Sequence, residues 1–139
     1  MIILKKYSTI CFILLSVLLF DCDRDNKTNC AITLCTQEYR FISIQIKQST
    51  DSSAVHLTDY KVFRISDNKD ITINDNVLND NLGYYPLVND SERAMLRNIN
   101  VEIEFQGYIQ DTLIIKKRFV VTADCCHVSL VSGDFLFYI

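Results

Sequence analysis

The chain has 139 residues, of which 49% are apolar and 22% charged, and its formal net charge is −3 at neutral pH. This composition can bury a core and differs from that of a disordered segment. The slight acidity argues against a nucleic-acid-binding protein, which needs a basic face to displace counterions from phosphates. The length allows one domain once any targeting segment is removed.

The N-terminus has the layout of a secretory signal. Lys5 and Lys6 form a positive region, and an apolar run of 11 residues follows at 10–20, interrupted only by Ser16. A membrane-spanning helix needs about 20 apolar residues, so the run predicts an export signal rather than a span. Cys22 comes almost directly after the run, where a signal for soluble export would end in small residues.

The stretch LLFDC, residues 18–22, resembles a bacterial lipoprotein signal. In that family the cysteine receives a diacylglyceryl group and becomes the first residue of the mature protein. Leu19 matches the family motif, whereas Phe20 and Asp21 depart from the small residues expected there. The resemblance implies lipid attachment at Cys22, and the acidic stretch 23–25 resembles surface-export signals of Bacteroidota lipoproteins. An unmodified thiol beside an uncleaved signal is the alternative.

Six cysteines occur, of which Cys11 lies within the signal. If Cys22 carries lipid, four cysteines remain for an oxidising compartment, namely Cys30, Cys35, Cys125 and Cys126. Four cysteines allow three connectivities, and a bridge between neighbours would strain the intervening peptide. The two others both link the N-terminal segment to a strand near residue 125, each closing a loop of about 90 residues. One bridge with two buried thiols also remains open.

A zinc site is the competing interpretation, because these four cysteines and His127 are zinc ligand types. The C-x4-C spacing is loose, and three consecutive residues cannot readily direct their side chains to one ion. We therefore expect disulfides, and no metal or other cofactor. Thiol–disulfide exchange would need a C-x-x-C motif or a low-pKa cysteine at a helix N-terminus, and the sequence shows neither.

Period-two alternation of apolar and polar residues predicts strands along most of the remaining chain. The strands are expected at 41–47, 59–66, 71–73, 84–88, 99–105, 112–121, 127–131 and 135–139, with a surface loop at 74–83 and a short helix near 90–97.

Two pairs of these strands are predicted to form hairpins. The strands at 99–105 and 112–121 are joined by a turn around Gly107, with Glu102 and Glu104 opposite Lys116 and Arg118. The last two strands are joined around residues 132–134. The pattern as a whole predicts an all-β fold, an antiparallel β-sandwich of about seven strands with one short helix.

The mature domain is similar to small cell-envelope lipoproteins of Bacteroidota bacteria. The similarity lies in CTQEYRFISIQIK, GYYPLVND, VEIEFQGYI and ADCCHVSLVSG. The strand pattern also resembles the transthyretin-like or carboxypeptidase-regulatory sandwich. Neither resemblance carries catalytic residues onto this chain. We expect a signal peptide at 1–21, a lipidated cysteine and tether at 22–34, and the sandwich at 35–139.

Residues that could perform catalysis are few. The two histidines are His56 and His127, and no nucleophile turn accompanies Ser129 or Ser132. The carboxylates of the long hairpin have predicted basic neighbours, which favours an ion-pair ladder over a glycosidase pair.

Tyr84 and Tyr85 are the candidate ligand contacts. Neighbouring strand residues face opposite ways, so one is expected in the core and the other at the surface, where tyrosine can stack on a sugar. These features predict a non-catalytic lipoprotein of the cell envelope that is anchored by lipid in the outer membrane and has a binding or accessory role. Its partners would be membrane lipid and a glycan or envelope protein, and no nucleic acid. A structural envelope component without a small ligand is the alternative, ahead of a small hydrolase.

Overall fold

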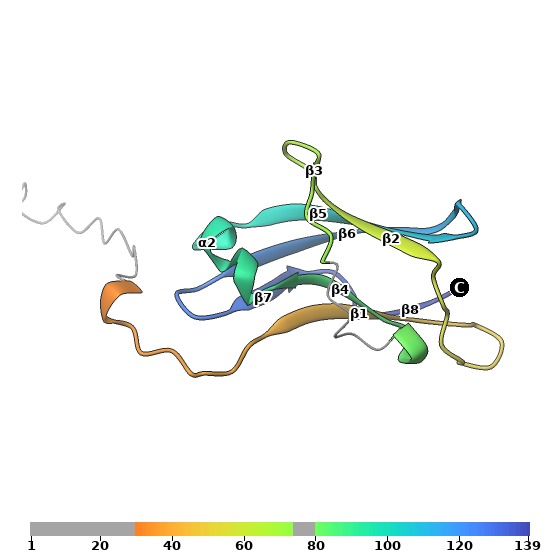
Figure 1. Cartoon of the computed structure of the whole chain (residues 1–139), viewed down its shortest axis with the longest axis horizontal. Helices are drawn as coiled ribbons and strands as arrows, with labels where there is room; N and C mark the ends of the chain where they lie inside the picture. Colours follow the sequence, from red (N-terminus) through yellow and green to blue (C-terminus); the bar gives the residue numbers. More distant parts are fainter. Residues whose placement is uncertain (1–29, 74–79) are drawn as a thin grey trace, which may run out of the picture.

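The alternating strands form two packed β-sheets. The computed structural model of the chain describes residues 30–73 and 80–139. The predicted signal, Cys22 and most of the loop at 74–83 lie outside these residues. Figure 1 shows the sheets as two layers, and one cluster of apolar side chains fills the space between them. The predicted all-β sandwich is confirmed.

The smaller sheet has the strand order β4–β1–β8, and the larger has the order β3–β2–β5–β6–β7. The strands are β1 (Phe41–Lys47), β2 (Asp59–Arg64), β3 (Lys69–Asp70), β4 (Tyr84–Asn89), β5 (Val101–Ile109), β6 (Thr112–Ala123), β7 (Val128–Ser132) and β8 (Leu136–Tyr138). The helical turns are η1 (Cys30–Ile32), η2 (Asp80–Leu82), η3 (Asp90–Glu92) and α2 (Arg93–Leu96). Among these strands the β1–β8 pair is parallel and the other pairs are antiparallel.

The core follows from the alternation in sequence. On β1 the side chains of Ile42, Ile44 and Ile46 are buried, while the residues between them are partly exposed. The facing sheet contributes Phe105 from β5 and Phe119 from β6, both almost fully buried. The two sheets thereby remove large apolar side chains from water, which is the main favourable contribution to folding.

The β5–β6 hairpin turns later than predicted. The turn lies at Gln110 and Asp111, which both have positive φ, 47° and 64°, as a two-residue hairpin turn of the primed type requires. Gly107 lies within β5, where an added Cβ would be 2.7 Å from Ile115 and 2.8 Å from Leu57. The glycine therefore serves close packing rather than a turn.

The charge pairing predicted for this hairpin is partly wrong. Glu104 lies opposite Arg118 as a direct neighbour, but Glu102 lies opposite Val120. An irregularity at 107–108 offsets the two strands by one residue. The position of such a bulge depends on the packing around the strand, which the alternation of the sequence does not report.

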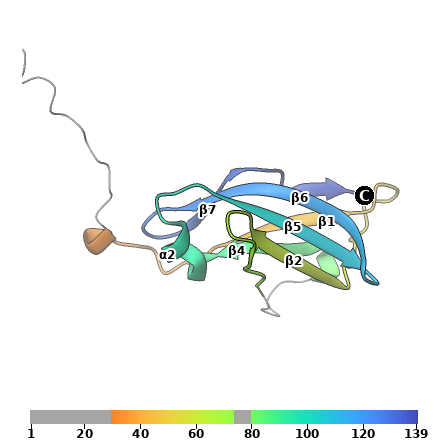
Figure 2. The same cartoon turned by 90° about the horizontal axis from the view of Figure 1, so that it is seen from above.

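The predicted final hairpin does not form. β7 pairs with β6, whereas β8 pairs in parallel with β1 in the other sheet. The chain crosses between the sheets at Gly133, which has φ 122° and where an added Cβ would lie 2.3 Å from Cδ1 of Phe119. Figure 2 shows from above the chain that continues from β7 to the C-terminus. A glycine at this position lets the backbone pass the Phe119 ring where a side chain would not fit.

Two shorter segments differ slightly from prediction. The third strand covers Lys69–Asp70 rather than 71–73, because the carboxylate of Asp70 accepts hydrogen bonds from the backbone and hydroxyl of Thr72 and turns the chain there. The helix predicted near 90–97 is divided into the 3-10 turn η3 and the single α-turn α2.

Candidate functional site

The N-terminal segment is bonded twice to the turn that follows β6. Disulfides join Cys30 to Cys125 and Cys35 to Cys126, each with a Cα–Cα distance of 5.2 Å. The sequence left open which of two cross-linked patterns forms. It also placed residue 125 in a strand, whereas β6 ends at Ala123. Because the two cysteines lie in a turn, neighbouring side chains need not point to opposite faces, and both can reach the N-terminal segment.

Asp124 shapes this turn. Its Oδ1 accepts hydrogen bonds from the backbone N–H of His127 and of Cys126, at 2.7 and 2.6 Å. These hydrogen bonds, the one from His127 first, lower the pKa of the Asp124 carboxyl against the opposing effect of its burial. The turn is therefore held in the shape that presents both cysteines.

A second polar group lies beside the disulfides. His127 places Nδ1 at 2.8 Å from Oδ2 of Asp90 and Nε2 at 2.9 Å from the hydroxyl of Thr36. The carboxylate of Asp90 also accepts from the backbone N–H groups of Arg40 and Val128, both at 2.9 Å. His127 is among the catalytic candidates of the sequence, but Asp90 and Thr36 are not, because they lie 37 and 91 positions away from it.

The order hydroxyl, imidazole and carboxylate resembles a hydrolase triad, but its surroundings indicate a structural junction. The ring of His127 and the carboxylate of Asp90 are buried. The carboxylate of Asp90 accepts hydrogen bonds from backbone N–H groups at the starts of β1 and β7, and so links these two strands. The Thr36–His127 bond itself fits either interpretation, because a triad also joins its hydroxyl to the imidazole. The structural interpretation rests on the two backbone N–H groups, of Arg40 and Val128, that the Asp90 carboxylate accepts from.

The two candidate tyrosines separate as the alternation requires. Tyr85 is buried, and its hydroxyl donates to the carbonyl of Val55 at 2.7 Å and accepts from the N–H of Leu57 at 2.8 Å. Tyr84 is 40% exposed. Tyr85 is therefore a core residue, and only Tyr84 can meet a ligand at the surface.

Tyr84 belongs to a larger surface that we call the small-sheet face. It comprises Gln45, Lys47, Tyr84, Leu136 and Tyr138. Gln45 lies between Tyr84 of β4 and Leu136 of β8 in the cross-strand register, and Lys47 lies beside Tyr138. Both β8 residues are exposed. Their place beside β1 was not predicted, because the sequence assigned them to a hairpin with the preceding strand.

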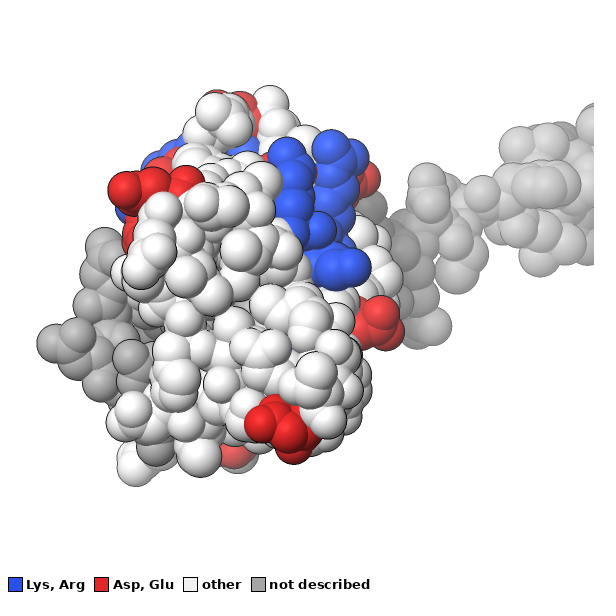
Figure 3. All heavy atoms as spheres, turned by 90° about the vertical axis from the view of Figure 1, so that its right-hand side faces the viewer, with Lys and Arg blue, Asp and Glu red and all other residues white. Residues whose placement is uncertain are grey.

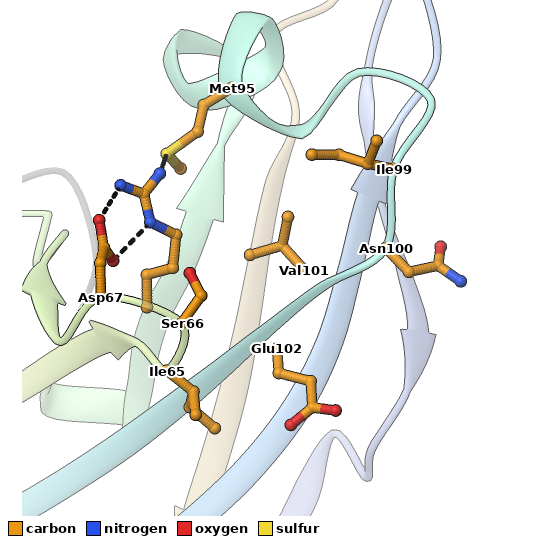
Figure 4. Close-up of a pocket in the computed structure, with 9 residues that line it drawn as sticks. Ile65, Ser66, Asp67, Met95, Ile99, Asn100, Val101 and Glu102 are labelled. Carbon is orange, nitrogen blue, oxygen red and sulfur yellow. Dashed lines mark hydrogen bonds and ion pairs between the residues drawn. The ribbon is translucent and has the colours of Figure 1, made fainter.

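One open pocket of about 510 Å³ lies between α2, the turn after β2 and the start of β5. The guanidinium of Arg64 contacts both the carboxylate of Asp67 and the sulfur of Met95. Figure 4 shows Val101 and Glu102 further along the pocket. Nε of Arg64 donates to Asp67 at 2.8 Å, and this hydrogen bond lowers the pKa of Asp67 to about 2. The ion pair neutralises the cation, so the pocket is poorly suited to an anionic ligand.

The exposed face of the larger sheet carries a charged network around Glu104. The side chain of Glu104 is nearly buried. Its carboxylate forms ion pairs with Nζ of Lys116 at 2.8 Å and Nε of Arg118 at 3.4 Å, and it accepts a hydrogen bond from the amide of Gln106 at 2.7 Å. The hydrogen bond from Lys116, and then the one from Gln106, lower the pKa of Glu104. Figure 3 shows lysine and arginine side chains gathered on one flank of the molecule. The network sets one carboxylate against two cations, so Glu104 is fully paired, as in a sheet ion-pair ladder, while the group as a whole keeps a positive charge.

The other features of the described residues give no further candidate site. His56 is exposed in the segment between β1 and β2. Within residues 30–73 and 80–139, no group of three or more metal-ligating side chains lies together. The same residues contain no helix long and apolar enough to cross a membrane. No protein-family model, curated protein or solved structure matches the chain.

Proposed function

We propose that the protein is exported and anchored by lipid in the cell envelope, in the outer membrane, where its sandwich domain has a non-catalytic binding or accessory role. The observation that carries this proposal is the pair of disulfides between the N-terminal segment and the 124–127 turn. Paired disulfides persist in oxidising compartments and are rare where thiols are kept reduced.

The N-terminal sequence supports the anchor. An apolar run too short to span a bilayer ends almost directly before Cys22. A lipoprotein cysteine carries at least two acyl chains, and two chains are needed for firm attachment. The first disulfide begins at Cys30, eight positions later, so the anchor and the domain would be separated by a short segment only.

The small-sheet face supports the binding role. It combines two exposed tyrosines and a leucine with the amide of Gln45 and the ammonium of Lys47. Aromatic rings give contact area at low entropic cost. The ammonium of Lys47 and the side-chain oxygen of Gln45 supply polar groups beside them, while Nε2 of Gln45 donates to the carbonyl of Leu82. This combination suits a sugar chain or a protein surface.

The intact mass of the protein purified from membranes tests export and anchoring together. We expect a chain that begins at Cys22, carries acyl groups, and is four hydrogens lighter than its reduced form because of the two disulfides. Recovery of a full-length cytosolic chain with all thiols reduced would contradict the proposal.

A glycan array tests the binding role. Tyr84→Ala and Tyr138→Ala should weaken binding of any glycan that the protein retains, whereas Leu113→Ala, an exposed apolar residue of the β5–β6 hairpin, should not. Binding that is unchanged in both tyrosine variants would exclude the small-sheet face. A protein that captures no glycan but cross-links through this face to an envelope protein would favour the alternative, a structural component.

A further inference from the structure

The loop between the two N-terminal cysteines presents apolar side chains to solvent. This bridged loop, residues 30–35, has the sequence CAITLC and contains no charged residue. Ile32 is 82% exposed and Leu34 is 98% exposed. Its helical turn η1 contains no buried residue. Neither side chain therefore contributes to the core of the sandwich.

The disulfides make this exposure a fixed feature of the domain. Both ends of the bridged loop are bonded to neighbouring residues of one turn, Cys125 and Cys126. That turn is itself held by the Asp124 hydrogen bonds. The loop therefore cannot leave this end of the molecule or fold back over the sheets. Scattered single apolar residues are ordinary at a surface, but a fixed and uncharged apolar loop marks an interaction site.

The position of the loop in the chain indicates what the site meets. Cys30 follows Cys22 by eight positions, and eight residues span at most about 29 Å when fully extended. On the proposed function, on which this inference rests, Cys22 is fixed at the bilayer surface by its acyl chains. The bridged loop is then the first part of the domain after the anchor and stays within that distance of the headgroups.

We infer that the bridged loop inserts Ile32 and Leu34 into the interfacial layer of the membrane that holds the lipid anchor. Apolar side chains partition into the boundary between headgroups and acyl chains, and here the anchor has already removed the cost of bringing the domain to the surface. The loop gives the domain a fixed orientation. η1 lies at one end of the molecule and β8 with the C-terminus at the other (Figure 1), so the β8 end faces away from the bilayer.

The chain contains no tryptophan, so one substitution creates a single fluorescent probe. Leu34→Trp places it on the bridged loop. Leu113→Trp is the matched control, because Leu113 is also an exposed leucine, at 46%, and lies in the β5–β6 hairpin. Ile32→Trp is a second probe of the loop.

Each lipidated variant is purified from membranes and reconstituted into phosphatidylethanolamine–phosphatidylglycerol vesicles, with and without brominated phosphatidylcholine. For Leu34→Trp and Ile32→Trp we expect emission at shorter wavelength in vesicles and about twofold quenching by the brominated lipid, since tryptophan settles at the membrane interface. Leu113→Trp should show neither change. Adding Leu34→Glu to Ile32→Trp should return its emission toward that of a water-exposed ring.

Two results would overturn the inference, and mass spectrometry of the same samples separates them. The first result is a protein that carries acyl chains but whose two loop probes show no change in emission wavelength and no quenching in vesicles. The lipid anchor would then be present, but the loop would not insert into the membrane. If no acyl chain is found on Cys22, the proposed function fails and the membrane assignment of the loop fails with it. Equal quenching of the loop probes and Leu113→Trp would also overturn a specific insertion of the loop.

Discussion

Nδ1 of His127 lies 2.8 Å from Oδ2 of Asp90, and this pair joins three segments that are far apart in sequence. Asp90 follows β4, His127 precedes β7, and the same carboxylate accepts from the N–H of Arg40 before β1. The pair therefore connects both sheets at the end of the domain where the disulfides lie. Thr36, bonded to the other ring nitrogen, extends the connection to the N-terminal segment.

Asp90→Asn should destabilise the domain by about 2 kcal/mol, because hydrogen bonds to a charged group are worth about 1.5–3 kcal/mol. The two oxygens of Asp90 accept from three donors, on Arg40, His127 and Val128, whereas asparagine has a single acceptor oxygen. Urea unfolding at pH 7 measures the loss. Asp134→Asn, at an exposed position, is the control and should leave the unfolding free energy unchanged.

The same pair should make stability depend on acid pH. Burial acts to raise the pKa of Asp90, but hydrogen bonds from Arg40, His127 and Val128 outweigh it and lower the pKa below its ordinary value. A lowered pKa in the folded state stabilises the protein above the unfolded value, about 3.9, and this contribution is lost as pH falls through the folded value. The gap between wild type and Asp90→Asn should therefore shrink below about pH 4. A gap of constant size from pH 7 to pH 2.5 would contradict this.

Removing one disulfide should cost much less than removing both. The bridges close loops of 95 and 91 residues, and a loop of this size is worth about 4.7 kcal/mol in the chain-entropy model. Once either bridge is closed, the other closes only a ring of about eight residues, worth about 2.5 kcal/mol.

A cycle of paired serine variants tests this coupling. We expect a loss of about 2–3 kcal/mol for Cys30→Ser with Cys125→Ser, and a similar loss for Cys35→Ser with Cys126→Ser. The quadruple variant should lose about 7 kcal/mol, more than the sum of the two pairs. Urea unfolding of all four proteins provides the comparison. Strictly additive losses would show that the bridges act on separate parts of the unfolded chain.

The strands that were predicted well are those whose faces differ clearly in polarity. FISIQIK places Ile42, Ile44 and Ile46 on one face, and β1 has the predicted bounds, 41–47. The same alternation showed that one of Tyr84 and Tyr85 lies in the core. It could not show which one, because that depends on the register of β4 against Ile44.

The parts that were not predicted depend on contacts between distant residues. FLFYI is apolar at nearly every position, so no pattern shows that Leu136 lies beside Gln45 in the other sheet. In the sequence, Asp90 stands at the start of the short helix predicted near 90–97, and His127 at the start of the strand predicted at 127–131. Only the packing of the sheets brings them together, and with them the structural junction that the sequence did not reveal.

Gly133→Ala should destabilise the domain by about 2–4 kcal/mol. The residue has φ 122°, and its Cβ would lie 2.3 Å from the ring of Phe119. Both the backbone strain and the displacement of a core ring oppose the substitution. Thermal or urea unfolding measures the loss, with the adjacent exposed Ser132→Ala as control. A stable Gly133→Ala variant would mean that β8 does not cross to β1 over this ring.

Tyr85→Phe should destabilise the domain by about 1–3 kcal/mol, because it leaves two partly or fully buried backbone groups without their partner. The hydroxyl accepts from the N–H of Leu57 and donates to the carbonyl of Val55, and phenylalanine can do neither. Tyr84→Phe, at the exposed neighbour, should change stability by less than about 0.5 kcal/mol. Urea midpoints with unchanged slopes make the comparison. If the two variants were equally stable, Tyr85 could not hold the segment between β1 and β2 against the core.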